Sequence, residues 1–414
     1  RDFLDFGKIR LSYGKSGKQF EYPYFAFGVL IVNNIPFHGN QTITPYWPNG
    51  LINPKLSWEE TKQFDAGLDL EFFGNRLSLE LDYYYRYTDK LLAQVTLPGD
   101  YNAYTAQWQN AYAISNQGIE LQIKADLIRS EKLHWDFSFN IARNWNRFEK
   151  SNNGMDFTNL ASKHNLNIIG KPLNGIYVYN DEGYYNSQDE VPLYYVNGRR
   201  KYLSSLGNQI YSPGDRRIQD VDGNGQVATM VPLLEDRVYG GSPLPLAFGG
   251  IASTLKWKGI DVNLLFSYKL GRHVLNAGRG ASVGTILRAN TAEMMVPILA
   301  DLDKVSFWQK PGDNTDFPIN ELENGKNNFA TNLKSNVEKI NYLKLKSISI
   351  GYILPVFPKQ SKHYARVFMS VENVFTITNS SSPDPESIDI VTGVDSNNNY
   401  PLATRFTLGL TLNL

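Results

Sequence analysis

The sequence lacks cysteine altogether, which excludes a disulfide framework, a thiolate nucleophile and any thiolate metal site. It also lacks a surplus of charge, because 41 Lys and Arg residues balance 41 Asp and Glu residues, so nothing resembles the basic footprint of a nucleic-acid-binding protein. The longest apolar run, from Phe25 to Val32, is far shorter than the roughly 20 residues of a transmembrane helix. No signal peptide opens the chain, which starts at Arg1 shortly before an apparent strand, and we expect it to be a fragment of a longer protein.

Aromatic residues are plentiful, with 25 Tyr, 22 Phe and 7 Trp, and these types favour strands and membrane interfaces. The dominant signal is strict alternation. Between Leu77 and Tyr87 apolar or aromatic residues occupy the odd positions, and polar residues occupy most of the even ones. Since successive side chains of a strand point to opposite faces, this segment predicts a strand with one apolar and one polar face.

The same alternation recurs along the chain and predicts about ten strands. They lie near residues 6–16, 57–73, 77–95, 108–128, 133–149, 245–257, 260–274, 338–354, 364–378 and 402–414. Several of them exceed both the roughly 9–11 residues needed to span a bilayer and the roughly 5–6 residues of a typical soluble strand. The pattern therefore predicts an all-β protein whose strands cross a membrane.

The connections between these strands alternate in length. The short ones lie at 74–76, 129–132, 258–259 and 355–363, and the longer ones at 17–56, 96–107, 150–244, 275–337 and 379–401. Short periplasmic turns and long extracellular loops are typical of outer-membrane barrels. We therefore expect the short turns and the C-terminus on one rim, in the periplasm, and the long loops on the other.

Alternation also assigns the two faces of the strands. We expect the apolar residues Leu79, Leu121, Phe137, Leu264 and Leu408 to face lipid, and the polar residues Glu80, Gln122, Asp136, Asn263 and Thr407 to face the lumen. Open sheet edges in lipid leave backbone groups without hydrogen bonds, which is energetically costly. Loops of roughly 60 to 95 residues are too heavy for a small barrel and suit a large one. We therefore expect the strands near 6–16 and 402–414 each to present an unpaired edge in this chain or to pair with segments outside it.

A series of motifs in fixed order resembles the SusC/RagA family of TonB-dependent transporters. The motifs begin with Leu56-Ser-Trp58-Glu59-Glu60-Thr61 before Gly67-Leu68-Asp69, Asn75-Arg76-Leu77, Asp82-Tyr83-Tyr84-Tyr85, Thr88-Asp89-Lys90-Leu91-Leu92 and Asn116-Gln117-Gly118-Ile119-Glu120-Leu121. They continue with Gly214-Asp215, Asp220-Val-Asp222-Gly223-Asn224-Gly225, Phe307-Trp308-Gln-Lys-Pro311-Gly312-Asp313, Leu343-Lys-Leu345, Gly351-Tyr352, Glu372-Asn373-Val374-Phe375-Thr376, Asp384-Pro385-Glu386 and the final strand from Arg405. Single motifs are weak, whereas their order and spacing together are specific.

The resemblance implies an antiparallel transmembrane β-barrel of 22 strands with a plug inside. Residues 1–414 would be its C-terminal portion, with about ten strands and long extracellular loops, and the plug and first strands would lie outside this chain. It further implies an importer of oligomeric nutrients, either glycan or peptide, in the outer membrane of a Gram-negative bacterium. A SusD-like surface lipoprotein would cover the mouth, and the TonB complex would act through the missing N-terminal part. Outer-membrane lipid would surround the strands.

Two other classes of protein compete with the transporter. One is an outer-membrane enzyme with a small closed barrel, which would need a catalytic cluster at the loop ends. The five histidines have no metal-ligand spacing on a helix, and no G-x-S-x-G motif occurs, so we expect no catalytic residue. The other is a soluble glycan-binding β-sandwich, which would need short strands and loops of similar length at both ends.

One constellation has the chemistry of a cation site. Asp220, Asp222 and Asn224 supply oxygen atoms at the first, third and fifth positions of a loop, as at the start of a calcium-binding loop, and the Gln226 carbonyl would follow. The twelfth position is Val231 where such loops have Glu, and Glu235 or Asp236 could substitute. The alternative is an ordinary polar turn closed by Asx hydrogen bonds. We expect calcium as the only cofactor and place it at Asp220, Asp222, Asn224, Gln226 and Asp236.

Aromatic residues in the long loops have two interpretations. They could stack on sugar rings or bind peptides, or they could simply pack at the protein surface. They are Trp47, Tyr101, Tyr104, Trp108, Tyr194 and Tyr195. Residues 285–302 have helical spacing and predict a short helix in an extracellular loop. No substrate-binding residue can be assigned from these patterns.

Overall fold

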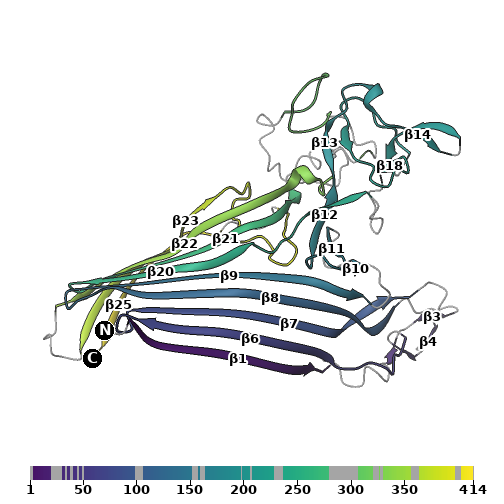
Figure 1. The fold of residues 1–414 in the computed structure, drawn as a ribbon. Helices are drawn as coiled ribbons and strands as arrows, with labels where there is room; N and C mark the ends of the chain where they lie inside the picture. Colours follow the sequence, from purple (N-terminus) through teal and green to yellow (C-terminus); the bar gives the residue numbers. More distant parts are fainter. Residues whose placement is uncertain are drawn as a thin grey trace. The chain divides into compact units, whose positions relative to one another are not determined.

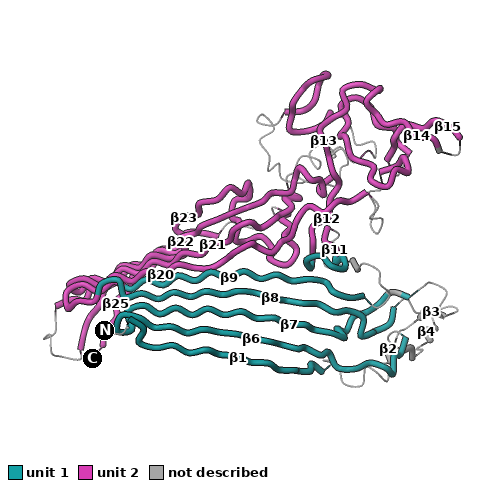
Figure 2. Tube along the Cα trace, in the orientation of Figure 1, with its two compact units in different colours: residues 1–128, 136–157, 167–173 teal, residues 129–135, 158–166, 174–414 magenta. Residues whose placement is uncertain are grey.

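A computed structural model describes most of the chain in two compact units. The described residues are 3–19, 30–32, 35–37, 41–43, 46–48, 51–97, 106–151, 157–158, 164–196, 198–205, 208–227, 236–278, 306–319, 326, 330–355, 363–396 and 402–413. Figure 2 colours the first unit, residues 1–128, 136–157 and 167–173, and the second, residues 129–135, 158–166 and 174–414. The residues predicted to form a helix, 285–302, lie outside the described part of the chain.

The first unit is built on long antiparallel strands that follow one another in chain order (Figure 1). They are β1 (Leu4–Lys18), β6 (Glu59–Phe72), β7 (Leu77–Thr96), β8 (Ala106–Arg129) and most of β9 (Leu133–Ser151). Between β1 and β6 lie two small hairpins, in which β2 (Leu30–Val32) pairs with β5 (Tyr46–Pro48) and β3 (Ile35–Phe37) with β4 (Gln41–Ile43). All five long strands begin and end within a few residues of the predicted positions.

The second unit contains the other five long strands, again in chain order. They are β20 (Ala247–Trp257), β21 (Ile260–Asn276), β22 (Val337–Leu354), β23 (Tyr364–Thr378) and β25 (Arg405–Asn413), with the short β24 (Val394–Asp395) parallel to the end of β21. The prediction of an antiparallel all-β fold with ten long strands is confirmed. Among the described residues, no helix is long and apolar enough to span a membrane.

The short turns use residues that tolerate a left-handed backbone. Lys258 and Gly259 have φ values of 48° and 88°, the combination that a two-residue hairpin turn needs to match the twist of its strands. Between β6 and β7, Gly74 and Asn75 also have positive φ values. The carboxylate of Asp5 accepts hydrogen bonds from both of their N–H groups, at 2.6 and 3.1 Å.

Within each unit, the short turns lie at one end of the strands. In the first unit the N–H of Asp126 donates to the carbonyl of Arg76 at 2.8 Å, which brings the end of β8 to the β6–β7 turn. In the second unit Trp257 pairs with Ile260, and Ile260 pairs with Tyr352. The long loops therefore leave from the opposite ends of the strands, and the predicted sorting of loops by rim is confirmed inside each unit.

The strand register confirms the predicted division of the strands into one apolar and one polar face. An apolar ladder crosses the first unit, because Ile9 pairs with Leu68, Leu68 with Leu81, and Leu81 with Leu121. One residue along, Asp69 pairs with Glu80, which pairs with Gln122, so the neighbouring ladder is polar. In the second unit Leu408 pairs with Met369, whereas Thr407 pairs with Ser370.

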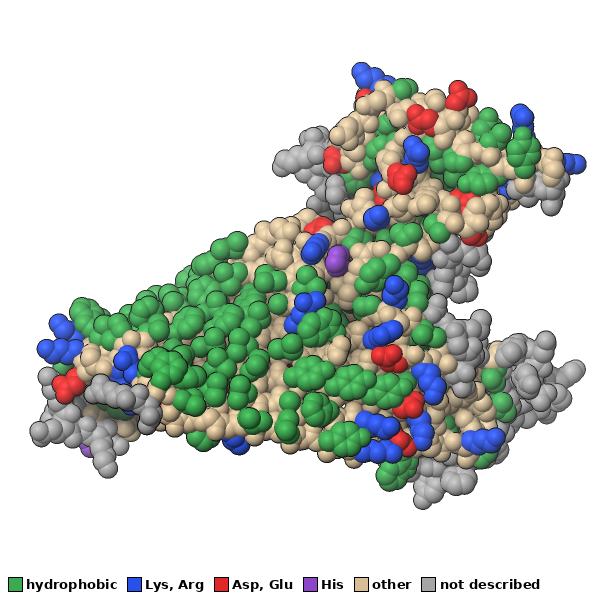
Figure 3. Space-filling view, viewed as in Figure 1, with side chains coloured by type: hydrophobic (Ala, Val, Ile, Leu, Met, Phe, Trp, Pro, Cys, Tyr) green, Lys and Arg blue, Asp and Glu red, His purple; other side chains and the backbone are tan. Residues whose placement is uncertain are grey.

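The apolar face of the strands is open, not packed into a core. Leu81 is 38% exposed, Ile119 44% and Leu408 78%. In Figure 3 hydrophobic side chains gather over the middle of the strands, and charged side chains lie towards the strand ends. Two packed sheets would bury this face, as in a β-sandwich.

Among the described residues of the second unit, the largest cluster of buried hydrophobic side chains instead lies in its long loops. The described residues of the region 150–244, predicted only as a loop, form ten short strands and a 3-10 helix. These are β10 (Phe157–Thr158), β11 (Asn165–Asn167), β12 (Gly175–Tyr179), β13 (Asp181–Tyr184), η2 (Gln188–Glu190), β14 (Leu193–Val196), β15 (Arg199–Tyr202), β16 (Ser204–Ser205), β17 (Arg216–Ile218), β18 (Gln226–Val227) and β19 (Arg237–Gly241). A second 3-10 helix, η4 (Lys334–Asn336), precedes β22.

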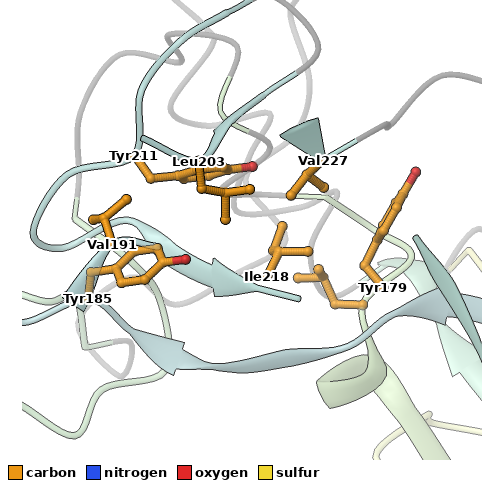
Figure 4. Close-up of a cluster of buried hydrophobic side chains, with 8 residues drawn as sticks. Tyr179, Tyr185, Val191, Leu203, Tyr211, Ile218 and Val227 are labelled. Carbon is orange, nitrogen blue, oxygen red and sulfur yellow. The ribbon is translucent and has the colours of Figure 1, made fainter. Parts of the chain in front are cut away.

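We call the described residues of 174–241 and 306–336 the loop module. Its core consists of the side chains of Tyr179, Tyr185, Val191, Leu203, Tyr211, Ile218, Val227 and Leu333, each at most 2% exposed (Figure 4). The rings of Tyr185 and Tyr211 lie 6.1 Å apart within it. The module is therefore a folded body with its own hydrophobic core.

Candidate functional site

The polar face of the first unit is a network of charged side chains. Arg10 on β1 contacts Asp69 on β6 at 2.7 Å, and Asp82 and Glu80 on β7 at 2.9 and 3.3 Å. Gly67 leaves room for this guanidinium, because a β-carbon there would lie 2.6 Å from Arg10 Cζ. One cation thus crosslinks three strands on the face predicted to line the lumen.

On the second unit, ion pairs hold residues 380–395 against the strands. The ammonium of Lys344 on β22, buried at 3% exposure, lies 3.2 Å from Asp384 and 3.0 Å from Glu386. Burial alone would raise the pKa of Glu386, but hydrogen bonds from Lys346 and Lys344 lower it below its usual range. The fully buried Arg272 donates to the backbone carbonyls of Pro243 and Ile388.

Buried ion pairs also join the segments of the loop module. Arg216 lies 2.8 Å from Asp181, and Lys326 lies 2.6 Å from Asp215, with all four side chains nearly buried. Asp215 also accepts hydrogen bonds from the N–H and the hydroxyl of Ser212, at 2.7 and 2.9 Å. These pairs connect stretches of chain that are far apart in the sequence.

The loop module has a cavity of 520 Å³ that is open to solvent on one side. Its walls come from residues 181–186, 216–217, 312–317 and 330–336. Two hydrogen bonds fix the 312–317 segment: the N–H of Gly312 donates to Asn186 Oδ1 at 2.7 Å, and the hydroxyl of Tyr184 donates to the Thr315 carbonyl at 3.2 Å. The cavity is therefore held open by contacts within the module.

Three carboxylates of the expected calcium loop come together. Oxygen atoms of Asp220, Asp222 and the fully buried Asp236 all lie within 4.8 Å of one another. Since calcium binds oxygen ligands at roughly 2.3–2.6 Å, carboxylates this close could share one ion. Val231 and Glu235 lie outside the described residues.

The expected ligand Asn224 is engaged in the turn itself, and so is the N–H of Gln226. The Nδ2 group of Asn224 donates to Asp222 at 2.7 Å, and Asn224 Oδ1 accepts the N–H of Gln226 at 2.7 Å. The carboxylate of Asp220 accepts the N–H groups of Gly223 and Gly225, both at 2.8 Å. This is the hydrogen-bond pattern of the alternative interpretation, a polar Asx turn.

Tyr194 faces these carboxylates. Burial raises its pKa to about 12, together with the negative charge of Asp220, to which its hydroxyl is hydrogen-bonded, and the charges of Asp236 and Asp222. A β-carbon on Gly225 would lie 3.2 Å from the ring, so the glycine lets the loop approach it. The neighbouring ring of Tyr195 is 69% exposed.

Of the other loop aromatics, Tyr101 and Tyr104 lie outside the described residues, and Trp108 lies on β8. Sequence reasoning missed the core of the loop module, its ion pairs and its cavity. Two sequence motifs could have indicated this module: Gly214-Asp215 and the stretch from Phe307 to Asp313. The structure brings these two motifs into contact.

Long antiparallel strands with one open apolar face and one charged face define the chain as part of a membrane-spanning β-barrel. The family model described as "TonB dependent receptor-like, beta-barrel" matches residues 2–278, and the chain belongs to this family.

Curated relatives carry the same family name. TonB-dependent receptor P3 of Formosa agariphila is 29% identical over 98% of this chain and 39% of its own length. TonB-dependent receptor SusC of Bacteroides thetaiotaomicron is 26% identical over 98% of this chain and 37% of its own length. The chain thus spans less than half the length of these relatives. They are receptors and not enzymes, so the alternative of an outer-membrane enzyme is not supported.

Solved structures show the same fold. The RagAB peptide transporter aligns over 100% of this chain and 41% of its own, with a TM-score of 0.71 and 24% identity. The RagAB peptide importer in its "open-open" state aligns with a TM-score of 0.68 and 23% identity. These matches exclude the soluble β-sandwich and confirm the resemblance to the SusC/RagA fold.

Proposed function

We propose that the chain is the C-terminal portion of a TonB-dependent importer in the outer membrane of a Gram-negative bacterium. The observation that supports this most directly is the open apolar face, on which Leu81 and its ladder partners face outward across strands of 14 to 24 residues. Lipid covers that face, and the charged ladder around Arg10 lines the lumen. The long loops, including the loop module, then stand on the extracellular side.

The importer takes up an oligomeric nutrient together with a SusD-like lipoprotein at the cell surface. This part of the proposal draws on the likeness to SusC and to the RagAB peptide transporter. The loop module supports it, because a folded body on the extracellular side offers both a docking surface and a ligand cavity. TonB acts through parts of the whole protein that lie outside this chain.

Uptake in cells tests the importer. A strain deleted for the whole gene is expected to lose growth on the nutrient, and the intact gene to restore it. Uptake is expected to stop when the proton gradient is collapsed, because the TonB complex draws its energy from the inner membrane. Uptake that persists without the gradient would show a passive pore and contradict the proposal.

We also propose that Asp220, Asp222 and Asp236 hold a calcium ion, with Asn224 and the Gln226 carbonyl completing the loop. The convergence of three carboxylates within 4.8 Å supports this, since such a group is electrostatically costly without a cation. A weak affinity of roughly 10⁻⁴–10⁻³ M would suffice in an extracellular medium. The ion would stiffen the loop beside Tyr194, a structural role and not a catalytic one.

A further inference from the structure

The cavity of the loop module has the size and rigidity of a ligand site. Its volume of 520 Å³ falls within the roughly 300–1,000 Å³ of small-molecule pockets. The segment 312–317 is held to Asn186 and Tyr184 by hydrogen bonds. Elsewhere in the lining Asp181 forms an ion pair with Arg216 and also accepts the N–H of Ser335 at 2.9 Å.

The lining carries an excess of negative charge. Four carboxylates, Asp181, Glu182, Asp313 and Asp316, face two guanidinium groups, Arg216 and Arg217, which leaves a surplus of two negative charges. Both guanidinium groups already point at carboxylates of the protein. Arg216 lies 2.8 Å from Asp181, and Arg217 lies 4.0 Å from Glu182.

Three of the four carboxylates are at least partly exposed and can contact a ligand. The side chain of Glu182 is 54% exposed, whereas that of Asp181 is 2% exposed. Asp316 is exposed and accepts the Ser306 hydroxyl at 2.9 Å, and Asp313 is half-buried and accepts the N–H groups of Gln309 and Lys310 at 3.1 and 3.0 Å. Each carboxylate is a further acceptor in the lining. A cationic group entering the cavity would thus find acceptors on two sides.

The aromatic residues of the lining do not suit a sugar. A sugar site commonly offers an open aromatic face on which the ring can stack. The ring of Tyr184 already carries the guanidinium of Arg216 at 5.3 Å, and Phe317 is only 6% exposed and packs on Phe307 with the ring centroids 5.9 Å apart. Charge complementarity, and not stacking, is the recognition chemistry that this cavity offers.

We propose that this cavity binds a cationic group of a peptide: a lysine ammonium, an arginine guanidinium or an N-terminal amine. Glu182, Asp313 and Asp316 accept charge-assisted hydrogen bonds, which are stronger than neutral ones. The inference rests on the proposed importer function and narrows its substrate class to basic peptides, which the negative cavity would concentrate near the barrel mouth.

Calorimetric titration of the whole purified receptor with trilysine tests the site. We expect trilysine to bind, and its form acetylated at every amine to bind at least tenfold more weakly. Asp313→Asn with Asp316→Asn keeps the shape of both side chains but removes two charges. Hydrogen bonds to charged groups contribute roughly 1.5–3 kcal/mol each, so about tenfold or more should be lost per charge. Glu182→Gln tests the same point without touching a turn.

The matched control is Asp189→Asn, which removes an exposed carboxylate of the loop module outside the cavity and should leave binding unchanged. Equal binding of trilysine and its acetylated form, or no effect of Glu182→Gln and the double variant, would overturn the site. So would tighter binding of the neutral sugar maltotriose. Uptake is measured separately. Trilysine binding without uptake would contradict the proposed importer function alone, and uptake without trilysine binding would contradict the proposed peptide site alone.

Discussion

Gly214 lies directly against the indole of Trp308, so closely that a β-carbon on the glycine would come within 2.6 Å of Trp308 Cε3. Its φ value of +90° is one that other residues rarely adopt. The carbonyl of Gly214 also accepts the N–H of Ile319 at 2.9 Å. Two distant stretches of the loop module therefore depend on one position that has no side chain.

Replacing Gly214 with Ala is expected to destabilise the loop module by more than backbone strain alone. The positive φ costs about 1–3 kcal/mol, and the clash with Trp308 adds about 1–3 kcal/mol more. Gly183→Ala is the matched control, because Gly183 has a φ of +91° with no atom within 4 Å of the added carbon. Hydrogen exchange of the module's amides measures the stability of the two variants. Equal protection in Gly214→Ala and Gly183→Ala would show that the contact with the Trp308 indole does not contribute.

The buried pair of Lys326 with Asp215 should stabilise the module far more than an exposed pair does. Lys326→Met leaves the fully buried Asp215 carboxylate without its cation, which is expected to cost about 3–5 kcal/mol. Arg217→Met, which removes the exposed partner of Glu182 at 4.0 Å, should cost less than about 1 kcal/mol. Hydrogen exchange of the β17 amides gives the free energy of opening for each variant. Similar losses of this free energy in Lys326→Met and Arg217→Met would contradict the prediction.

The two faces of β8 should respond in opposite ways to a charge. Leu121 pairs with Leu81 on the apolar ladder, and Leu121→Arg near the middle of the bilayer is expected to cost about 2–4 kcal/mol. Gln122 pairs with Glu80, so Gln122→Arg places a cation beside a carboxylate and should cost little. Refolding of the whole receptor in lipid vesicles measures both, and equal stabilities would refute the assignment of faces.

The strands could be predicted from the sequence because one periodicity fixes both their existence and their faces. The alternation from Leu77 to Tyr87 gives the strand one apolar and one polar side, so β7 appears where it was expected. The turn positions could be predicted for the same reason, because the alternation stops where a turn begins. It stops at Lys258-Gly259, where both residues have positive φ values.

The loop module could not be predicted in this way because its contacts are long-range and its strands are short. A two-residue strand such as β16 has no periodicity to detect. Its stability comes from pairs such as Asp215 with Lys326, and no local pattern states which residues will meet. Lys344 and Asp384 illustrate the same point. Each belongs to a motif that the sequence shows, but only the structure shows that the two side chains form an ion pair.

The calcium proposal makes a spectroscopic prediction through Tyr194. Burial, together with the charges of Asp220, Asp236 and Asp222, holds the pKa of this phenol at about 12, above its ordinary value of 10.0. A raised pKa means that the folded state binds the proton more tightly than the unfolded state. The associated stability is therefore complete below pH 10 and is lost as the pH rises towards 12.

A calcium ion among those carboxylates would cancel the charge that opposes the phenolate. Millimolar calcium is thus expected to lower the pKa of Tyr194, although burial keeps it above the ordinary value. Absorbance at 295 nm during alkaline titration reports the phenolate, and subtracting the curve of Tyr194→Phe isolates this one tyrosine. The variant Asp220→Ala/Asp222→Ala should show a lower pKa without calcium and no response to it. If calcium leaves the Tyr194 curve of the unaltered protein in place, and calorimetry shows equal heats for the two proteins, the loop is a polar turn that holds no ion.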